Sequence, residues 1–143
     1  MIVKQVSIFL ENKIGRLAEI TALLGETDIN MRALAIADTA EFGILRLIVD
    51  KPDAACNLLR QRGFAAQETD VIVVEVPDEP GALAQILEVL EQSSLNIEYL
   101  YAFVEHSGKN ALVVFRIEKI KEAVQVLQKA HVRVMGPENI YEL

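Results

Sequence analysis

Hydrophobic and polar residues follow two different periods along the first half of the chain. Val6, Ile8 and Leu10 alternate with Gln5 and Ser7, which is the pattern of a β-strand. Leu17, Ile20 and Leu24 then recur at the spacing of one face of a helix. Two apolar segments joined by a turn, a shorter helix and a closing strand follow, at residues 30–38, 43–50, 55–59 and 64–69. The predicted order is therefore βαββαβ.

The same order recurs in the second half of the chain. An offset of 66 residues places residues 10–36 over residues 76–102, and seven of these 27 positions are identical, where chance gives about two. The identical pairs are Gly15/Gly81, Leu17/Leu83, Ala18/Ala84, Ile20/Ile86, Leu24/Leu90, Asn30/Asn96 and Leu34/Leu100. The second set of elements is expected at residues 71–76, 83–90, 97–106, 111–117, 120–127 and 132–135. The chain is therefore an internal duplication of one module.

These elements predict an α+β fold of two ferredoxin-like βαββαβ modules. Each module is expected to have an antiparallel sheet with both helices on one face. The modules span residues 1–69 and 70–143, because Thr69 leads almost directly from one strand into the next without a linker.

Turn signals mark several element boundaries. Gly25 and the pair Ser93-Ser94 are expected to end the first helix of each module. Ser107-Gly108 marks a turn between two strands of the second module. Residues 138–143 are a candidate edge strand.

Two of the predicted strands are apolar on both faces. Residues 44–49 and 112–117 are nearly continuous apolar runs, whereas a sheet face in contact with water is expected to be polar. Either the sheet of the other module or a second chain must cover this face. We therefore expect a homo-oligomer, most simply a two-fold homodimer.

Composition and charge exclude several classes of protein. The 143 residues are 52% hydrophobic, and their net charge of −7 opposes binding to a phosphate backbone, so no nucleic acid partner is expected. Cys56 is the single cysteine, which fits a reducing, cytoplasmic location. No apolar run approaches the roughly 20 residues that cross a bilayer, so we expect no membrane partner.

The loops that lead from the first strand of each module into its first helix are the candidate functional sites. Both contain a glycine at the helix start, Gly15 and Gly81, where unpaired backbone N–H groups suit a carboxylate. Asn12 and Asp78 precede them and can either cap the helix or accept a hydrogen bond from an ammonium group. A second recurring polar pair, Asn30 and Asn96, begins the next strand of each module; a turn residue that satisfies its own backbone is the other interpretation of this pair.

With these features the chain resembles the ACT domain family, in particular its tandem members. The resemblance rests on residues 78–83, Asp-Glu-Pro-Gly-Ala-Leu, and on residues 95–97, with 15–17 and 29–31 as the first module's version. It covers essentially the whole chain. It implies a regulatory module that binds a small molecule, commonly an amino acid, at an interface between modules or subunits. The positions that match the family's ligand-contacting segments are Asn12, Ile14, Gly15, Asn30, Met31, Asp78, Pro80, Gly81, Asn96 and Ile97.

The first module departs from the family pattern in its loop. Asn12 stands where the second module has an acidic residue, and Ile14 where it has a proline. Either both loops bind an effector, or one binds and the other supplies a packing surface. The residues that would face the effector's side chain are apolar: Met31, Leu34, Ile97 and Leu100. They favour a branched-chain or otherwise apolar amino acid as the effector.

Other function classes find little support in the sequence. The two histidines, His106 and His131, do not fall at matching positions of the modules, Cys56 lies on an apolar helix face, and no glycine-rich phosphate loop is present. We predict no catalytic residues, no metal and no cofactor. An RNA-binding module of the same element order would carry aromatic and basic residues on its sheet, and residues 44–47 and 112–115 carry few. The serious alternative is a regulatory subunit that docks on an amino-acid biosynthetic enzyme.

Overall fold

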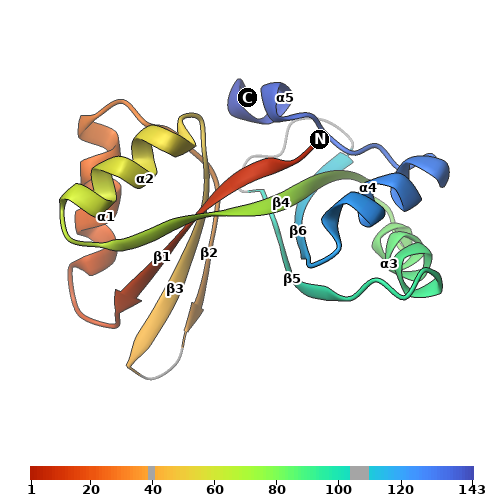
Figure 1. Cartoon of the computed structure of the whole chain (residues 1–143), viewed down its shortest axis with the longest axis horizontal. Coiled ribbons are helices and arrows are strands. Elements are labelled where there is room, and N and C mark those ends of the chain that lie inside the picture. Colours follow the sequence, from red (N-terminus) through yellow and green to blue (C-terminus); the bar gives the residue numbers. More distant parts are fainter. Residues whose placement is uncertain (39–40, 104–109) are drawn as a thin grey trace. The chain divides into compact units, whose positions relative to one another are not determined.

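The computed structural model describes residues 1–38, 41–103 and 110–143 (Figure 1). The elements, in chain order, are β1 (Val3–Glu11), α1 (Arg16–Glu26), β2 (Met31–Asp38), β3 (Phe42–Val49), α2 (Pro52–Gln61), β4 (Ala65–Pro77), α3 (Ala82–Gln92), β5 (Ile97–Ala102), β6 (Asn110–Ile117), α4 (Ile120–Lys129) and α5 (Pro137–Tyr141). The chain divides into two compact units. The N-terminal unit comprises Lys4–Thr69 with Tyr141–Leu143, and the C-terminal unit comprises Met1–Val3 with Asp70–Ile140.

The N-terminal unit is a sheet with both of its helices on one face. Its strands follow the order β2-β3-β1-β4, and β3 runs antiparallel to β1 and to β2. Helices α1 and α2 lie along one side of these strands (Figure 1). Alternate strand residues and one stripe of each helix form the core: Val6, Ile8, Leu10, Ile20, Leu24, Leu45, Leu47, Val49, Ala55, Cys56 and Leu59. Burial of this apolar surface is what holds the helices on the sheet.

The C-terminal unit repeats the arrangement. Its strands follow the order β4-β6-β5, with β6 antiparallel to both neighbours. Its core joins the strands to α3 and α4 through Ile72, Val74, Val76, Ile86, Leu90, Val113, Phe115, Ile117, Ala123 and Leu127. The predicted fold class, two ferredoxin-like modules of α+β type, is confirmed by this architecture.

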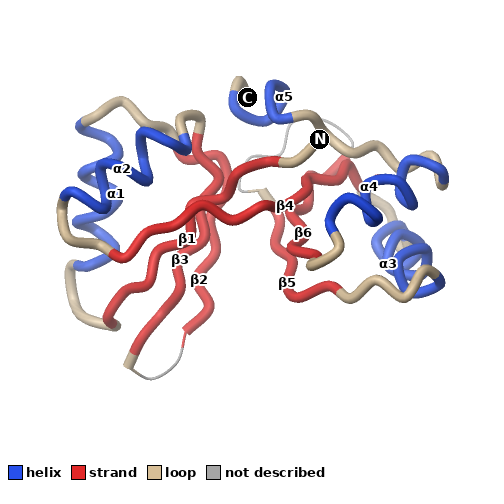
Figure 2. Tube along the Cα trace, in the orientation of Figure 1, coloured by secondary structure: helices blue, strands red, loops and turns tan. Residues whose placement is uncertain are grey.

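The structure corrects the prediction where the modules join and at the C-terminus. The strands expected at 64–69 and 71–76 are one uninterrupted strand, β4 (Figure 2), because no glycine or proline breaks the extended backbone between them. The strand expected at 132–135 is reduced to a single bridge between Val74 and Val134.

The candidate edge strand at residues 138–143 is wrong, because residues 137–141 form the short helix α5. Pro137 begins this helix, and proline is suited to the first helical position, where the missing N–H costs nothing. The fully buried Ile140 fixes the helix to the rest of the chain.

Two turn predictions have different outcomes. Helix α1 continues through Gly25 to Glu26, and the left-handed residue after it is Asp28, with φ of 59°. An aspartate tolerates this conformation, so the stop did not require the glycine. Helix α3 ends at Gln92, next to Ser93-Ser94, as expected. The predicted turn at His106, Ser107 and Gly108 lies outside the described residues.

The second face of the strands differs between the units. In the C-terminal unit, Val71, Val73 and Val114 are fully buried within the single chain. In the N-terminal unit, Phe9 and Ile44 remain 51% and 37% exposed. A homodimer that covers the exposed side chains stays a prediction.

Candidate ligand-binding site

The two candidate loops have the same backbone geometry. Gly15 and Gly81 precede α1 and α3 with φ of 88° and 86° and ψ of −10° and −8°. Three backbone hydrogen bonds recur at the offset of 66 residues. They are Lys13 N–H to Glu11 O with Glu79 N–H to Pro77 O, Arg16 N–H to Lys13 O with Ala82 N–H to Glu79 O, and Glu19 N–H to Gly15 O with Gln85 N–H to Gly81 O. The repeat in sequence is therefore a repeat in loop structure.

No side chain caps either helix among the described residues. The residue at the cap position is Gly15 in α1 and Gly81 in α3, and neither helix start receives a side-chain hydrogen bond. Asn12 is tied to the strands instead, since its N–H donates to the carbonyl of Glu41 at 2.9 Å. The interpretation of Asn12 and Asp78 as helix caps is therefore wrong, and the first-turn N–H groups are not covered by a side-chain acceptor.

Both loops are open to solvent. Asn12, Ile14 and Gly15 are exposed in the first, and Asp78 through Gly81 in the second. A Cβ added at either glycine would have no heavy atom within 4 Å. The glycines are therefore required by their left-handed backbone, and the space in front of them remains available to a ligand.

A small hollow of about 140 Å³ lies beside the first loop. Its lining joins the loop to the ends of β1, β2 and β3, through Leu10, Glu11, Asn12, Lys13, Arg16, Leu17, Ile36, Phe42 and Gly43. The Lys13 ammonium lies 2.6 Å from a Glu11 carboxylate oxygen, and this hydrogen bond and charge lower the pKa of Glu11. Arg16 pairs with Glu19 at 3.4 Å. Ile36 and Phe42 were not predicted from the sequence as lining residues; the available signal was an apolar side chain near the end of a strand, where a polar one is expected.

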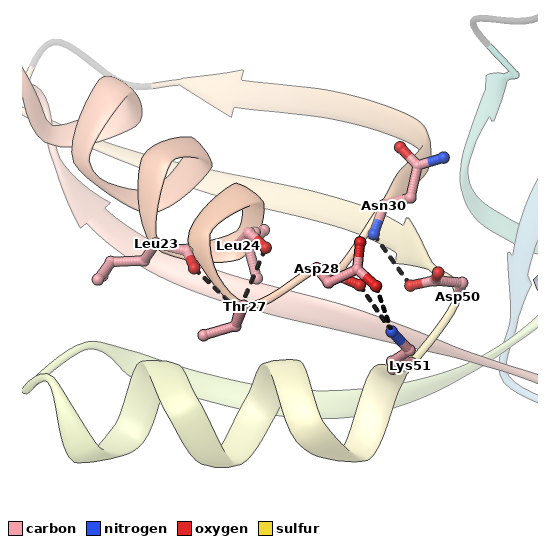
Figure 3. Close-up of polar contacts among 7 residues, drawn as sticks. All are labelled: Leu23, Leu24, Thr27, Asp28, Asn30, Asp50 and Lys51. Atoms are coloured by element: carbon pink, nitrogen blue, oxygen red, sulfur yellow. Dashed lines mark hydrogen bonds and ion pairs between the residues drawn. The ribbon is translucent and has the colours of Figure 1, made fainter.

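Asn30 lies at the other end of the sheet from Asn12 and Gly15. Its N–H donates to Asp50 Oδ1 at 3.0 Å, and the Asp50 N–H donates to the Asn30 carbonyl at 3.1 Å. Figure 3 shows that the Asn30 side-chain amide points away from Asp50. The backbone of Asn30 therefore behaves as a turn residue, and its side-chain amide is exposed.

Asp28 and Lys51 stabilise the same corner (Figure 3). Lys51 Nζ donates to the Asp28 carbonyl at 2.6 Å and lies 3.7 Å from a carboxylate oxygen of Asp28. Thr27 ends α1 there by donating its hydroxyl to the Leu23 carbonyl at 2.9 Å. These contacts fix the entry into β2, where Asn30 is placed.

The C-terminal unit separates its candidate residues in the same way. Pro77, which begins the second loop, pairs with Asn110 at one end of β6, whereas Ile97 pairs with Ile117 at the other end. Asn96 is exposed beside Ile97. The loop of the N-terminal unit therefore brings together Asn12, Ile14 and Gly15, and Asn30 lies far from it. The loop of the C-terminal unit brings together Asp78, Pro80 and Gly81, and Asn96 lies far from it.

The predicted selectivity residues divide into two kinds. Met31 and Ile97 are half-buried and pack against the two cores. Leu34 and Leu100, at matching positions of the repeat, are 39% and 40% exposed on the edge strands β2 and β5. Only the edge leucines are accessible from outside each unit.

The part of the chain that the structure describes holds no group of three metal-ligating side chains. Cys56 is buried, and burial raises the pKa of its thiol. No helix in the described ranges is long and apolar enough to cross a membrane.

The family model described as an ACT domain pair matches residues 1–143. Among solved structures, protein BT0572 from Bacteroides thetaiotaomicron is similar at 42% identity and a TM-score of 0.94, over 100% of this chain and 98% of that chain. The regulatory subunit of aspartate kinase from Thermus thermophilus, in its ligand-free form, has the same fold at 15% identity and a TM-score of 0.64, over 89% of this chain and 91% of that one.

Aspartokinase III from E. coli, in complex with aspartate and ADP, contains a similar fold at 17% identity and a TM-score of 0.58. The match covers 91% of this chain and 32% of that chain. The comparison with curated proteins gave no match. The resemblance stated from the sequence is confirmed over the full length. This chain belongs to the ACT domain pair family.

Proposed function

We propose that this protein is a regulatory module that binds a free amino acid through the loops at residues 11–15 and 77–81. The observation that carries the proposal is the shared geometry of Gly15 and Gly81, which leaves first-turn backbone N–H groups of α1 and α3 without a side-chain acceptor among the described residues. Such N–H groups, together with the positive end of the helix dipole, bind an effector carboxylate.

The ammonium group of the effector would be accepted by side-chain oxygens of the same loops. Asp78 supplies a carboxylate in the second loop and Asn12 an amide oxygen in the first. The carboxylate is the stronger partner for a cation, since a charge-assisted hydrogen bond is about twice as strong as a neutral one. We therefore assign the higher affinity to the loop of the C-terminal unit.

A complete site requires two modules. Asn30 and Asn96 lie at the opposite end of each sheet from the loops, so one unit cannot contact an effector with both segments. The proposed site combines the loop of one module with the strand start of another, in a homodimer. Its residues are Asn12, Ile14, Gly15, Asn30, Met31, Asp78, Pro80, Gly81, Asn96 and Ile97.

Binding of the effector would be passed on as a change in the self-association of the chain. Binding of the effector and dimerisation are thermodynamically linked. If dimerisation changes the affinity for the effector by some factor, the bound effector changes the dimerisation constant by the same factor. The alternative is a regulatory subunit that docks on a biosynthetic enzyme; the Thermus thermophilus relative is named as the regulatory subunit of aspartate kinase. In either form we propose a non-catalytic, cytoplasmic protein that uses no cofactor.

Thermal unfolding against each of the twenty amino acids at millimolar concentration tests the proposal. A ligand bound only by the native state raises Tm by mass action, about 2.7 kcal/mol of stability at one hundred times Kd. We expect one aliphatic amino acid to raise Tm, and Gly81→Val to remove that rise. Gly25→Ala, inside α1, is the control that keeps it. If folded protein responds to none of the twenty, the amino-acid effector is excluded.

Light scattering with and without the active amino acid tests the dimer. We expect the effector to change the monomer–dimer equilibrium, and Asn96→Ala to reduce that change. An effector that binds with unchanged mass at every protein concentration would favour the alternative in which the output passes to an enzyme partner.

A further inference from the structure

A groove of about 440 Å³ lies in the C-terminal unit, outside the loop of residues 78–81. It lies between α3, the end of β4 and the turn that follows α4. Residues Pro77, Ile86, Val89 and Val132 give it apolar walls, and Glu75 and Arg133 lie at its polar end. Pockets that bind small molecules have this volume and this combination of an apolar lining with a few polar groups.

The N-terminal unit has a groove at the matching position, and larger side chains fill part of it. Gly63 and His131 are both left-handed residues after the second helix, with φ of 86° and 60°, and they align the two grooves. The N-terminal groove measures about 250 Å³. Where it has Arg16, Glu19, Arg62 and Phe64, the C-terminal groove has Ala82, Gln85, Ala130 and Val132. Two long cations and an aromatic ring are thus replaced by small side chains, which enlarge the space.

A charge replaces an apolar residue at two positions of this groove, because Arg133 stands where the N-terminal unit has Ala65. Glu75 is the other of them, and it matches Phe9 at the offset of 66 residues. Its Oε1 accepts a hydrogen bond from Asn110 Nδ2 at 3.1 Å, and its Oε2 accepts one from Arg133 Nη1 at 3.2 Å. Its side chain is only 22% exposed. A carboxylate has about four acceptor positions, so a fixed Glu75 can accept further hydrogen bonds from a ligand.

The groups around Glu75 define the ligand that fits. A fixed, half-buried carboxylate binds an ammonium group, and Ile86 and Val89, which line the same groove, bind an aliphatic chain. Arg133 has further N–H donors, which suit a carboxylate on the same ligand. The chemistry common to these contacts is a small aliphatic molecule with an ammonium group.

We propose that this groove is a second small-molecule site, which binds an aliphatic amine or amino acid with its ammonium group on Glu75. The site uses Glu75 and Arg133 rather than residues 78–81, although Pro77 and Ala82, which border the effector loop proposed above, also line the groove. No sequence pattern pointed to this groove, because Glu75 and Arg133 are far apart in the chain and meet only through the pairing of residues 73–75 with 133–135.

The test is an NMR titration of the full ¹⁵N-labelled chain. The probes are L-leucine, isopentylamine, which lacks the carboxylate, and isocaproate, which lacks the ammonium group. We expect shifts at the backbone amides of Gln85, Val89 and Val132 with leucine or isopentylamine, and none with isocaproate. Binding of both amines indicates recognition of the ammonium alone, whereas binding of leucine only indicates that Arg133 is used as well.

Three variants separate the groove from the loops. Glu75→Gln is expected to weaken binding roughly tenfold, because one hydrogen bond to a charged group is lost. Ala82→Arg and Val132→Phe, which restore the residues of the filled groove, should abolish it. Glu19→Gln, at the matching groove of the N-terminal unit, is the charge-matched control and should bind like the original chain.

The proposal is overturned if neither amine shifts these amides, or if folded Glu75→Gln and Ala82→Arg variants bind as tightly as the original chain. Gly81→Val distinguishes this result from failure of the effector proposal. That variant should retain groove binding, and loss of groove binding in folded Gly81→Val protein would show that only one site exists.

Discussion

The rings of Phe9 and Phe42 stack on the exposed face of β1 and β3, with centroids 5.1 Å apart and an interplanar angle of 27°. Both side chains remain largely exposed, at 51% and 39%. The pair therefore joins the first strand to the third on the side of the sheet that the helices do not cover.

A double-mutant cycle measures what this stack contributes. We expect Phe9→Leu and Phe42→Leu to couple by about 0.5–1.5 kcal/mol in the free energy of unfolding, the range of aromatic pairs. Denaturant unfolding of the four proteins at a concentration where the chain is monomeric gives the coupling. Strictly additive effects would mean that each ring packs independently.

The sequence predicted the repeated core well because its period is a local property. Ile20 and Ile86 occupy matching buried positions, and the spacing that placed them there follows from helix geometry alone. The ends of the modules were predicted less well. Helix α5 is stabilised by the burial of Ile140, and β4 is one strand shared by two modules. Neither feature follows from the local sequence pattern.

The candidate site shows the same division. The loops that hold Gly15 and Gly81 are local in sequence, and a glycine at a helix start predicted them correctly as loops. The distance between Asn30 and Gly15 depends on the direction of β2 relative to β1, which comes from strand pairing. Glu75 and Arg133 are likewise joined by pairing, so no spacing in the sequence pointed to them.

The left-handed glycines are expected to be sensitive to any side chain. Gly15→Ala and Gly81→Ala should each lower the free energy of unfolding by about 1–2 kcal/mol, the cost of this conformation for an L-residue. Steric contact adds nothing, because a Cβ there meets no neighbour within 4 Å.

Gly25→Ala is the matched control for these glycines. Gly25 lies inside α1 with space for a Cβ, and alanine is preferred in helices by about 0.5–1 kcal/mol, so this variant should be more stable. Thermal and denaturant unfolding measure all three. If Gly15→Ala or Gly81→Ala stabilised the protein as Gly25→Ala does, the assigned left-handed backbone conformations would be contradicted.

Helix α1 predicts different costs on its two sides. Ile20 is fully buried against the sheet, so Ile20→Ala should destabilise the protein by about 2–5 kcal/mol. Leu17 is 38% exposed, although it belongs to the same predicted apolar face, and Leu17→Ala should cost clearly less. Denaturant unfolding separates the two variants. Similar losses would show that Leu17 is covered in solution, as it would be in a homodimer, and a dilution series would then identify the partner.

Glu68 and Asp53 form a pair of acidic side chains whose effect depends on pH. A hydrogen bond that protonated Glu68 donates to Asp53, then burial and the Asp53 charge, raise the pKa of Glu68 above its ordinary value of 4.5. The folded state therefore binds this proton more tightly than the unfolded state. Its contribution to stability is fully present below pH 4.5 and is lost as pH rises through the raised pKa.

Replacing Glu68 by glutamine removes this loss. We expect Glu68→Gln to be more stable relative to the original chain at pH 7 than at pH 4, by at most about 0.5 kcal/mol, because Glu68 is exposed. Denaturant unfolding at several pH values gives the difference, and Glu91→Gln on the exposed side of α3 serves as the reference for removing one negative charge. A Glu68→Gln variant that loses stability with rising pH as steeply as the original chain would show that the Asp53–Glu68 hydrogen bond does not form in solution.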